Sequence, residues 1–316
     1  MKLSLAPIHG MTLAHYRNVY DEIFGHIDTY YAPFIATTHM RKSASKVFND
    51  ILPKNNNSNI DLIPQLIGNS ASDFRHFTSV ITKMGYKEIN WNIGCPFPRV
   101  TKKTKGSGLL EHPQMIDEFL SEVCKDDNYK LSVKLRLGYS NLSEGIKVVD
   151  VLNNYPLKGL TIHGRIGIQK YEGVVDLDGF EALRSISKHE ITYNGDIYDH
   201  SDFKNILERF PMIDNFMIGR GALRNPFLAS EIKSVITPND IKIKKMKAFH
   251  DSIYRYTNEN TSADIYLISR MKEFWIYASK HLSPDGSFMN QVEQCKTKDQ
   301  YDRYVDGMFE DMKWHG

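Results

Sequence analysis

The feature that most constrains this fold is a regular alternation of short apolar runs with helix-like segments up to about residue 235. The apolar runs lie near residues 2–7, 29–33, 62–67, 88–93, 131–137, 159–163, 191–193 and 215–218. Between them, stretches such as 72–84 and 113–124 repeat apolar residues at helical spacing. This alternation predicts parallel strands joined by right-handed crossovers. Eight such units predict a (β/α)₈ TIM barrel, a fold of roughly 250 residues.

The pattern changes after Pro238. Residues 242–258, 263–282 and 298–313 have helical periodicity, and no apolar strand pattern separates them. Tyrosine and phenylalanine are frequent in this part and are interleaved with lysine and arginine. We therefore predict a barrel domain over residues 1–237 and a small all-helical domain over residues 238–316.

Composition and cysteine usage limit the class of protein. The 316 residues carry 40 Lys and Arg against 38 Asp and Glu, a net charge of +2, which permits a polyanionic partner without requiring one. Three scattered cysteines are too few for a disulfide framework or a tetrahedral metal site. The N-terminal apolar run is too short for a signal peptide, and no stretch has the length of a membrane span. We expect a cytoplasmic protein that binds neither membrane nor metal.

Polar side chains follow nearly every predicted strand. In barrels of this type the active site lies at the C-terminal ends of the strands. The residues found there are His9, Gln65, Asn90, Asn92, Cys95, Lys134, Arg136, His163, Arg165, Asn194, Asp196 and Arg220. Packing alone does not account for so many polar strand ends, and we predict an active site at this end of the barrel.

Glycines after the last two predicted strands point to a phosphate site. Gly195, Gly219 and Gly221 would let the backbone approach an anion closely, and Arg220 would add a charged contact. The alternative is that these glycines are ordinary turn residues. With a single phosphate pocket, and without a Gly-x-Gly-x-x-Gly motif opening a helix after a strand, a flavin mononucleotide (FMN) fits the chain better than a dinucleotide.

Lys134 stands out on the fifth predicted strand. Strand alternation places Ser132, Lys134 and Arg136 on one face and the apolar residues on the other, which packs on the outer helices. Lys134 then points into the barrel, where a lysine is seldom tolerated without a partner. It could form an internal salt bridge, or its charge could stabilise an anion that develops on a cofactor or substrate ring.

Cys95 lies between Gly94 and Pro96 and is therefore expected on a turn at the end of the fourth strand. A free cysteine is most often an inert small apolar residue, and His163 could equally be a satisfied core histidine. The basic run that follows contains Arg99, Lys102, Lys103 and Lys105. Such a run is usually a solvated loop, but beside Cys95 it is a candidate contact for a phosphate backbone.

Together these motifs resemble the tRNA-dihydrouridine synthase family, most closely its DusC-like branch. The resemblance extends through the predicted barrel and continues weakly at residues 270–275. Its motifs are Ala6-Pro7, Gln65-Leu66-Ile67-Gly68, Asn92-Ile93-Gly94-Cys95-Pro96, Gly106-Ser107-Gly108-Leu109-Leu110, Val133-Lys134-Leu135-Arg136-Leu137-Gly138, His163-Gly164-Arg165, Asn194-Gly195-Asp196 and Ile218-Gly219-Arg220-Gly221-Ala222.

The resemblance implies an FMN-dependent enzyme that reduces a uridine in tRNA and uses NADPH to recharge the flavin. It implies that Cys95 donates a proton to carbon 5 of the uracil, that the flavin delivers hydride to carbon 6, and that Asn92 holds the base. It assigns the flavin ring to Pro7, Ile8, His9, Gln65, Lys134 and His163, and the FMN phosphate to Asn194, Gly195, Asp196, Gly219 and Arg220. The tRNA would meet Arg99, Lys102, Lys103, Lys105, Arg270 and Lys272.

Three departures and several alternatives accompany this resemblance. Ile8 replaces the usual methionine, His9 replaces an acidic or small residue, and Arg99 replaces a lysine. The branch points to position 16 of the D-loop, while another tRNA position or ribosomal RNA stays open. A second hypothesis keeps the FMN barrel but gives it a free pyrimidine. A third is an RNA-binding or RNA-folding module whose catalysis is lost or secondary.

Overall fold

The computed structural model describes residues 1–37, 44–311 and 313–315. The chain forms two compact units, each made of several segments. The first unit contains Met1–His9, Asp28–Asp196 and Phe210–Ile218, and the second contains Gly10–Ile27, Ile197–Arg209 and Gly219–Gly316. The division into domains 1–237 and 238–316 stays a prediction.

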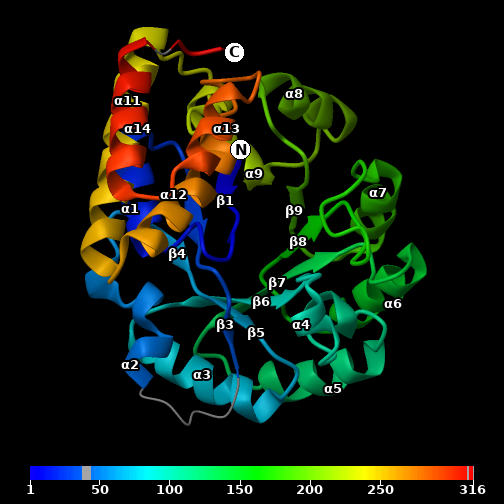
Figure 1. The fold of residues 1–316 in the computed structure, drawn as a ribbon. Helices are drawn as coiled ribbons and strands as arrows, with labels where there is room; N and C mark the ends of the chain where they lie inside the picture. Colours follow the sequence, from blue (N-terminus) through cyan, green and yellow to red (C-terminus); the bar gives the residue numbers. More distant parts are fainter. Residues whose placement is uncertain (38–43, 312, 316) are drawn as a thin grey trace. The chain divides into compact units, whose positions relative to one another are not determined.

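The first unit contains the whole β-sheet, and every pair of neighbouring strands in it is parallel (Figure 1). Its strands are β1 (Lys2–Leu5), β2 (Thr29–Tyr31), β3 (Ile35–Ala36), β4 (Leu62–Ile63), β5 (Gln65–Ile67), β6 (Glu88–Ile93), β7 (Lys130–Arg136), β8 (Leu160–His163), β9 (Ile191–Asn194) and β10 (Asn215–Ile218). Each of the eight predicted apolar runs is thus confirmed as a strand or a pair of short strands.

Two prolines explain why eight runs give ten strand segments. Pro33 separates β2 from β3, and Pro64 separates β4 from β5. Proline has no backbone N–H to give to a ladder, so each long strand is interrupted there. The strand order is β3-β5-β6-β7-β8-β9-β10-β1-β2-β4. β3 lies just beyond the predicted run 29–33. Because β2 and β3 follow each other along the chain, as do β4 and β5, the two ends of this order rejoin and close the predicted barrel.

Helices cover the outside of the barrel strands, with α3, α5, α6 and α7 in an outer row (Figure 1). The helices of the first unit are α2 (Ala44–Val47), α3 (Ala71–Lys83), α4 (Pro98–Thr101), α5 (Pro113–Val123), α6 (Leu142–Leu152) and α7 (Leu177–Ile186), with short 3₁₀ turns η1 (Asn49–Ile51), η2 (Pro53–Asn55) and η3 (Gly106–Leu109). Helix α3 begins where the Ser70 side chain accepts a hydrogen bond from Asp73 N. Helix α4 is a departure from the loop expected over the basic run.

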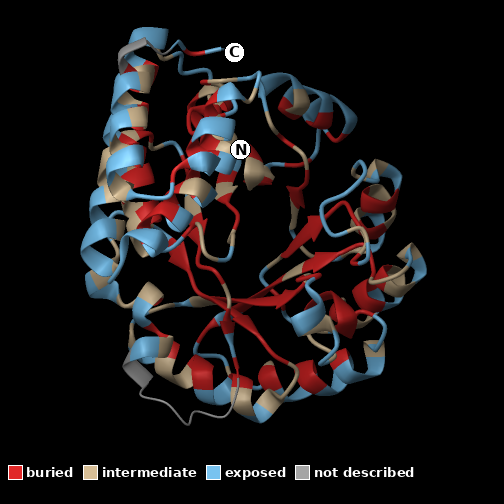
Figure 2. Ribbon diagram, viewed as in Figure 1, coloured by how far each residue is buried: buried red, intermediate tan, exposed pale blue. Residues whose placement is uncertain are grey.

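Strand β6 shows how the sequence separates the two faces of the barrel wall. Its apolar residues face outward, where Trp91 stacks on Phe119 of α5 with ring centroids 4.1 Å apart. Alternation then turns Asn90 and Asn92 to the interior, and both are buried. The strands of the first unit are buried along most of their length (Figure 2). Polar residues at these interior positions are therefore the ones available to build a site.

Within its described residues, the regular secondary structure of the second unit is all helical. Its helices are α1 (Ala14–Ile23), α8 (His200–Arg209), α9 (Arg220–Arg224), α10 (Leu228–Ile232), α11 (Asn239–Asn260), α12 (Asp264–Ala278), α13 (Ser287–Gln294) and α14 (Lys298–Asp311). The three helices predicted after Pro238 are confirmed with shifted ends. Helix α13 was not predicted, since it buries only Phe288 and Val292 and such a short helix shows little periodicity.

A buried polar contact lies in the aromatic core of this second unit. The Tyr301 hydroxyl accepts a hydrogen bond from Trp275 Nε1 at 2.7 Å and lies 2.9 Å from His250 Nε2. Burial lowers the pKa of His250, although the neighbouring Asp251 carboxylate opposes this shift. Side chains from α11, α12 and α14 are thereby joined.

Among the described helices, none is both long and apolar enough to cross a membrane.

Candidate active site

The turn that carries Cys95 is held by the side chain of Asn92. The Asn92 Oδ1 atom accepts hydrogen bonds from the backbone N–H groups of Gly94 and Cys95, both at 3.0 Å. Cys95 lies directly after β6 and is 7% exposed. The amide at the end of this strand therefore fixes the backbone from which the thiol projects.

The Gly106-Ser107 segment supports the same turn from the other side. Ser107 donates to the Cys95 carbonyl through its backbone N–H at 2.9 Å and through its hydroxyl at 3.1 Å. Gly106 has a φ of +56°, and a Cβ there would lie 2.5 Å from the Cys95 carbonyl oxygen. Only glycine fits this position. The two neighbouring sequence motifs are thus parts of one structural element.

A chain of buried side chains extends behind Asn92. Asn92 Nδ2 donates to Gln65 Oε1 at 2.8 Å, and Gln65 Nε2 donates to Asn90 Oδ1 at 2.8 Å. Asn90 Nδ2 then donates to the Ser132 hydroxyl at 2.9 Å. The family resemblance implied that Gln65 contacts the flavin, whereas in the structure its side chain is hydrogen-bonded to the two asparagines. Asn90 and Ser132 had no predicted role in this network.

A pocket opens where the strand ends of the first unit converge. Six predicted site residues line it, namely Pro7, His9, Asn92, Cys95, Lys134 and His163. Seven further residues complete the lining, namely Pro33, Phe34, Gly94, Pro96, Phe97, Arg136 and Tyr171. None of these described lining residues is acidic, so the pocket presents cations and hydrogen-bond donors to its contents.

Sequence reasoning missed the aromatic part of this lining. His9 stacks on Phe34 with ring centroids 5.5 Å apart, and the Arg136 guanidinium lies 5.5 Å from the ring centroid of Tyr171. Arg136 shares the inward face of β7 with Lys134, so alternation was a usable signal for it. Phe34, Phe97 and Tyr171 lie on loops, where no periodicity reveals the direction of a side chain.

Lys134 points into the barrel, as strand alternation predicts. Its amine donates a hydrogen bond to Asn194 Oδ1 at 2.6 Å. Burial, with a smaller contribution from the Arg136 charge, lowers the pKa of Lys134 to about 7. The partner in this contact is a neutral amide, not the carboxylate that a salt bridge would need. At neutral pH the Lys134 amine is therefore only about half protonated, and an electron-rich ligand would stabilise its cationic form.

The Cys95 thiol is set up to keep its proton. Burial raises the pKa of Cys95, while a backbone hydrogen bond from Phe97 and the charges of Arg136 and Arg99 oppose this shift. A raised pKa leaves the thiol protonated at neutral pH. The group is therefore suited to donate a proton, and poorly suited to act as a thiolate nucleophile.

His163 and Asp196 lie beside a buried arginine at the next strand ends. Arg165 Nη1 donates to Asp196 Oδ1 at 2.9 Å, and Arg165 Nη2 donates to Asp196 Oδ2. Asp196 has a φ of +29°, which is unusual for a residue other than glycine. Asn194 Nδ2 donates to the Met217 carbonyl at 2.8 Å. The side chains of Asn194 and Asp196 thus make contacts within the barrel unit.

The predicted phosphate residues fall in two units. Asn194, Gly195 and Asp196 belong to the first unit, and Gly219 and Arg220 to the second. Within the second unit, Arg220 lies 5.5 Å from the ring centroid of Tyr198. The phosphate site assembled from all five residues stays a prediction, as does a role for half-buried Ile8.

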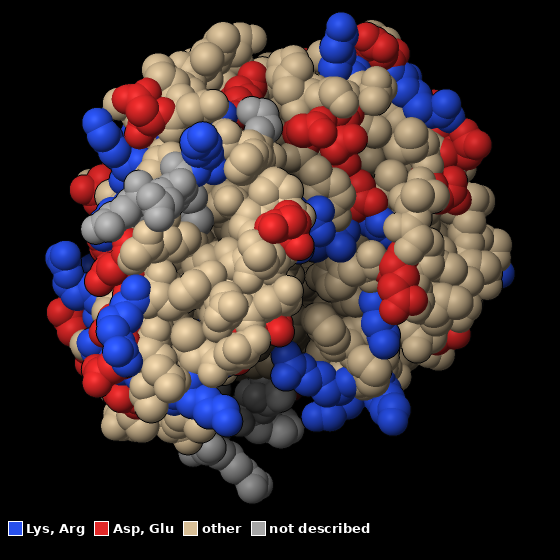
Figure 3. Space-filling model, turned by 45° about the horizontal axis from the view of Figure 1, so that its top comes forward, with Lys and Arg blue, Asp and Glu red and all other residues tan. Residues whose placement is uncertain are grey.

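The basic run beside Cys95 contains both exposed and anchored residues. Arg99, Lys102 and Lys103 are exposed, whereas Lys105 donates to the Thr37 carbonyl at 3.4 Å. Burial lowers the pKa of Lys105, and the nearby Lys103 charge adds to the shift while Asp73 opposes it. On the face drawn in Figure 3, basic side chains mix with acidic ones over much of the surface. A phosphate contact by the run stays a prediction, and its exposed members are the ones that solvent reaches.

Arg270 and Lys272 differ in their surroundings although both lie on α12. Arg270 Nη1 pairs with Glu273 Oε2 at 2.8 Å on an exposed face. Lys272 Nζ donates to the carbonyls of Glu293 and Cys295, both at 2.8 Å, at the C-terminal end of α13. Lys272 therefore stabilises the fold of the helical unit, and its role toward RNA stays a prediction.

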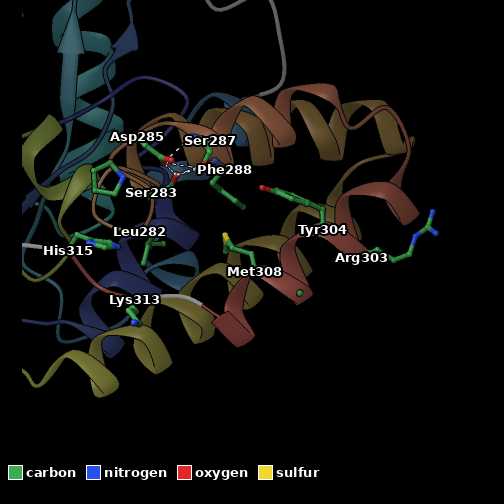
Figure 4. A pocket seen from close by; sticks show the side chains of 12 residues that line it. Leu282, Ser283, Asp285, Ser287, Phe288, Arg303, Tyr304, Met308, Lys313 and His315 are labelled. Carbon is green, nitrogen blue, oxygen red and sulfur yellow. Dashed lines mark hydrogen bonds between the residues drawn. The ribbon is translucent and has the colours of Figure 1, made fainter.

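A second hollow lies in the helical unit (Figure 4). Its lining includes Leu282, Phe288, Tyr304 and Met308. Figure 4 shows Asp285 turned toward Ser283 and Ser287, which donate hydrogen bonds to it. No predicted catalytic or cofactor residue lines this hollow.

Within the described ranges, no three His, Cys, Asp or Glu side chains come together as candidate metal ligands.

Comparison with known families supplies a match over nearly the whole chain. The model of the family described as "Dihydrouridine synthase (Dus)" matches residues 4–313. The tRNA-dihydrouridine(16) synthase of Neisseria meningitidis is 24% identical over 313 residues, covering 96% of this chain and 93% of that protein. The tRNA-dihydrouridine synthase B of Pasteurella multocida is 26% identical over 249 residues, covering 77% and 72%.

Comparison with solved structures supports the fold. Old yellow enzyme from Trypanosoma cruzi matches with a TM-score of 0.54 at 11% identity, covering 78% of this chain and 93% of that one. Histamine dehydrogenase from Rhizobium matches with a TM-score of 0.56 at 10% identity, covering 74% of this chain and 45% of that one. At these identities the likeness concerns the TIM barrel alone.

Proposed function

The chain belongs to the dihydrouridine synthase family, and from this premise we propose that it reduces the C5=C6 bond of uridine in tRNA with FMN and NADPH. We propose position 16 of the D-loop as the target and the DusC-like branch as its place in the family. The near full-length likeness to a relative named as a tRNA-dihydrouridine(16) synthase supports this choice. A cytoplasmic location suits such a substrate.

The pocket of the barrel unit has the chemistry that a flavin needs. Lys134 and His163 supply polar groups at its wall, and no described lining residue is acidic. We propose that these two side chains and the segment from Pro7 to His9 hold the flavin ring, with Gln65 acting through Asn92. Asn194, Gly195, Asp196, Gly219 and Arg220 are the proposed phosphate contacts. When bound and reduced, the flavin supplies hydride for carbon 6 of the uracil.

Cys95 then supplies the proton. Addition of hydride at carbon 6 leaves enolate-like charge at carbon 5 and the adjacent carbonyl, which an acid must quench. The raised pKa of Cys95 keeps a proton on sulfur at neutral pH. General acid catalysis of this kind is worth about 100- to 10,000-fold in rate. The thiol is therefore the proposed donor to carbon 5.

Asn92 contributes in two ways. Its Oδ1 atom positions the Cys95 turn, and one Nδ2 hydrogen is used by Gln65. An amide nitrogen has two hydrogens. Because Asn92 lines the pocket, we propose that the second hydrogen binds a carbonyl of the uracil. A single side chain would then align the base and the acid that protonates it.

The RNA must present its base outside the stacked helix. Turning a nucleotide out of folded RNA costs a few kcal/mol. We propose that phosphate contacts from Arg99, Lys102 and Lys103, with support from Lys105, Arg270 and Lys272, offset this cost. Exposed cations that neutralise phosphates release counterions, so binding of this kind weakens as salt increases.

The observation that carries the proposal is a buried thiol on a turn that lines the same pocket as the Lys134 amine. The test compares Cys95→Ala with Cys124→Ala, a cysteine at the end of α5. We expect Cys95→Ala to bind FMN and accept electrons from NADPH at the wild-type rate. Its formation of dihydrouridine in a tRNA transcript should fall by about 100-fold or more.

Two outcomes would contradict the proposal. Equal loss of flavin reduction and dihydrouridine formation in Cys95→Ala would make the cysteine structural, and purified protein that cannot take up FMN would refute the cofactor. Mapping dihydrouridine in RNA from cells with and without the gene tests the target. Loss of the modification elsewhere in tRNA, or in ribosomal RNA, would replace position 16.

A further inference from the structure

A buried arginine connects two strand ends at the mouth of the barrel. Arg165 follows β8, and Asp196 follows β9. Only 2% of the Arg165 side chain is exposed, and its charge is matched by the Asp196 carboxylate in a two-point contact. A buried guanidinium is costly unless its charge and its donors are satisfied. The surroundings of Arg165 meet that requirement closely.

Each of the five guanidinium N–H groups has an acceptor. The Nε atom donates to the Glu172 carbonyl at 3.2 Å, and Nη2 donates to the Gly173 carbonyl at 2.6 Å and to Asp196 Oδ2. The Nη1 atom donates to Asp196 Oδ1 at 2.9 Å. Its second hydrogen reaches the ring of His163, whose Nε2 atom lies 3.4 Å away.

Which atom donates in the contact between Arg165 Nη1 and His163 Nε2 determines which nitrogen of His163 carries the proton. Arginine has five donors and no acceptor, and it stays protonated in proteins. The Nε2 atom of His163 must therefore offer a lone pair to Arg165. A neutral imidazole has one protonated nitrogen, so the proton is then on Nδ1.

We propose that Arg165 is a positioning residue that fixes His163 as the neutral imidazole protonated on Nδ1. The consequence of this state for flavin binding rests on the proposed function. His163 lines the pocket, and in this state its polar hydrogen is a donor for an electron-rich ring edge of the flavin. The ring would add no positive charge beside Lys134. Arg165 is not among the residues that line the pocket, so it would act on a bound ligand through His163.

The same guanidinium holds the loop that brings Tyr171 to the pocket. Its acceptors Glu172 and Gly173 follow Tyr171 directly, and Gly173 has a φ of +64° that glycine adopts without strain. Arg165 thus links the state of His163 to the placement of an aromatic lining residue. Both depend on donors arranged in a planar fork, which a lysine cannot reproduce.

The test is nitrogen NMR of protein labelled with ¹⁵N-histidine, with His163 assigned by comparison with His163→Gln. In the wild type, with and without FMN, Nδ1 of His163 should give a pyrrole-type signal and Nε2 a pyridine-type signal. We expect the Nδ1–H form to exceed the other by roughly tenfold or more, because the donor is charged. A pyrrole-type Nε2, or a doubly protonated ring, would overturn the assignment.

Variants test the part played by Arg165. Arg165→Lys should raise the share of the Nε2–H tautomer, and Asp196→Asn, which keeps the arginine, should preserve the Nδ1–H form. Arg184→Lys is the matched control, since Arg184 makes a two-point contact with Glu181 on α7. Unchanged tautomers in a folded Arg165→Lys protein would refute the positioning role. If that variant fails to fold, the wild-type spectrum and Asp196→Asn still decide the assignment.

This measurement is independent of turnover on RNA. Protein that forms no dihydrouridine but shows His163 protonated on Nδ1 would refute only the proposed function. Protein that forms dihydrouridine while His163 is protonated on Nε2 would refute only the inference about Arg165.

Discussion

Two buried asparagines, one in each compact unit, make similar hydrogen bonds but support turns with different roles. In the helical unit, Asn225 Oδ1 accepts from Phe227 N at 3.0 Å and Nδ2 donates to Glu231 at 2.8 Å. In the barrel unit, Asn92 Oδ1 accepts from two backbone N–H groups, and Nδ2 donates to Gln65. Each amide holds a turn that follows the end of a helix or strand.

The difference lies in what the turn carries. The turn after Asn225 leads into the apolar residues of α10, which are buried. The turn after Asn92 ends in a pocket and presents a thiol to it. A buried polar network is therefore not evidence of a site by itself. It becomes one where strand ends converge and leave polar groups facing a space that a ligand can fill.

The largest expected effect comes from replacing each of the two asparagines separately by alanine. Asn92→Ala leaves two backbone N–H groups without their acceptor, and Asn225→Ala leaves one, so each variant should lose about 1–3 kcal/mol of unfolding free energy or more. Only Asn92→Ala should also reduce dihydrouridine formation by about 100-fold, because the Cys95 turn loses its support. Denaturant titration and a tRNA modification assay measure the two effects. Equal activity loss in both variants would remove the distinction.

The second prediction concerns the core of the helical unit. Tyr301→Phe removes the hydroxyl that Trp275 and His250 contact, and should lower the unfolding free energy by about 1–3 kcal/mol. Its FMN affinity at a temperature where the protein is folded should match the wild type. Thermal unfolding and flavin fluorescence provide the two readouts. A large loss of FMN affinity would show that this core also supports the flavin site.

The third prediction uses pH to separate Lys134 from surface lysines. Its folded pKa of about 7 lies below the ordinary value of 10.5. The unfolded chain therefore binds more protons between these values, and the free energy of unfolding of flavin-free protein should rise with pH across that window. Lys134→Met should flatten this rise, whereas Lys87→Met, at an exposed position, should leave it unchanged. Denaturant titrations at pH 7 and pH 10 measure the unfolding free energy of each variant. The same change in free energy with pH in the two variants would contradict the assignment.

The smallest effects are expected on α12. Arg270→Gln should weaken RNA binding a few-fold and reduce the slope of log affinity against log salt by about 0.7–0.9 if it contacts one phosphate. Lys272→Gln should mainly lower thermal stability, because it removes the donor to two carbonyls at the C-terminal end of α13. Filter binding over a salt series and thermal unfolding distinguish the two variants. The reverse pattern would make Lys272 the phosphate contact.

Much of the architecture was readable from the chain because its signals are local. Short apolar runs identified the strands, period-two alternation gave the inward face of Lys134, and the order of strands and helices predicted a closed barrel. The Asn-x-Gly-Cys-Pro motif indicated a turn with a thiol. These signals depend on a few adjacent residues, whose backbone and side-chain directions follow from secondary structure alone.

Other features were decided only by tertiary structure, because they depend on residues far apart in sequence. The sequence could not show that Gln65 binds Asn90 and Asn92, that Gly106 packs on the Cys95 carbonyl, or that Arg165 donates to Asp196 and to the Glu172 and Gly173 carbonyls. The charge states of side chains were also decided by tertiary structure, since the raised pKa of Cys95 and the lowered pKa of Lys134 follow from burial. Burial is a property of packing, which no local pattern of residues contains.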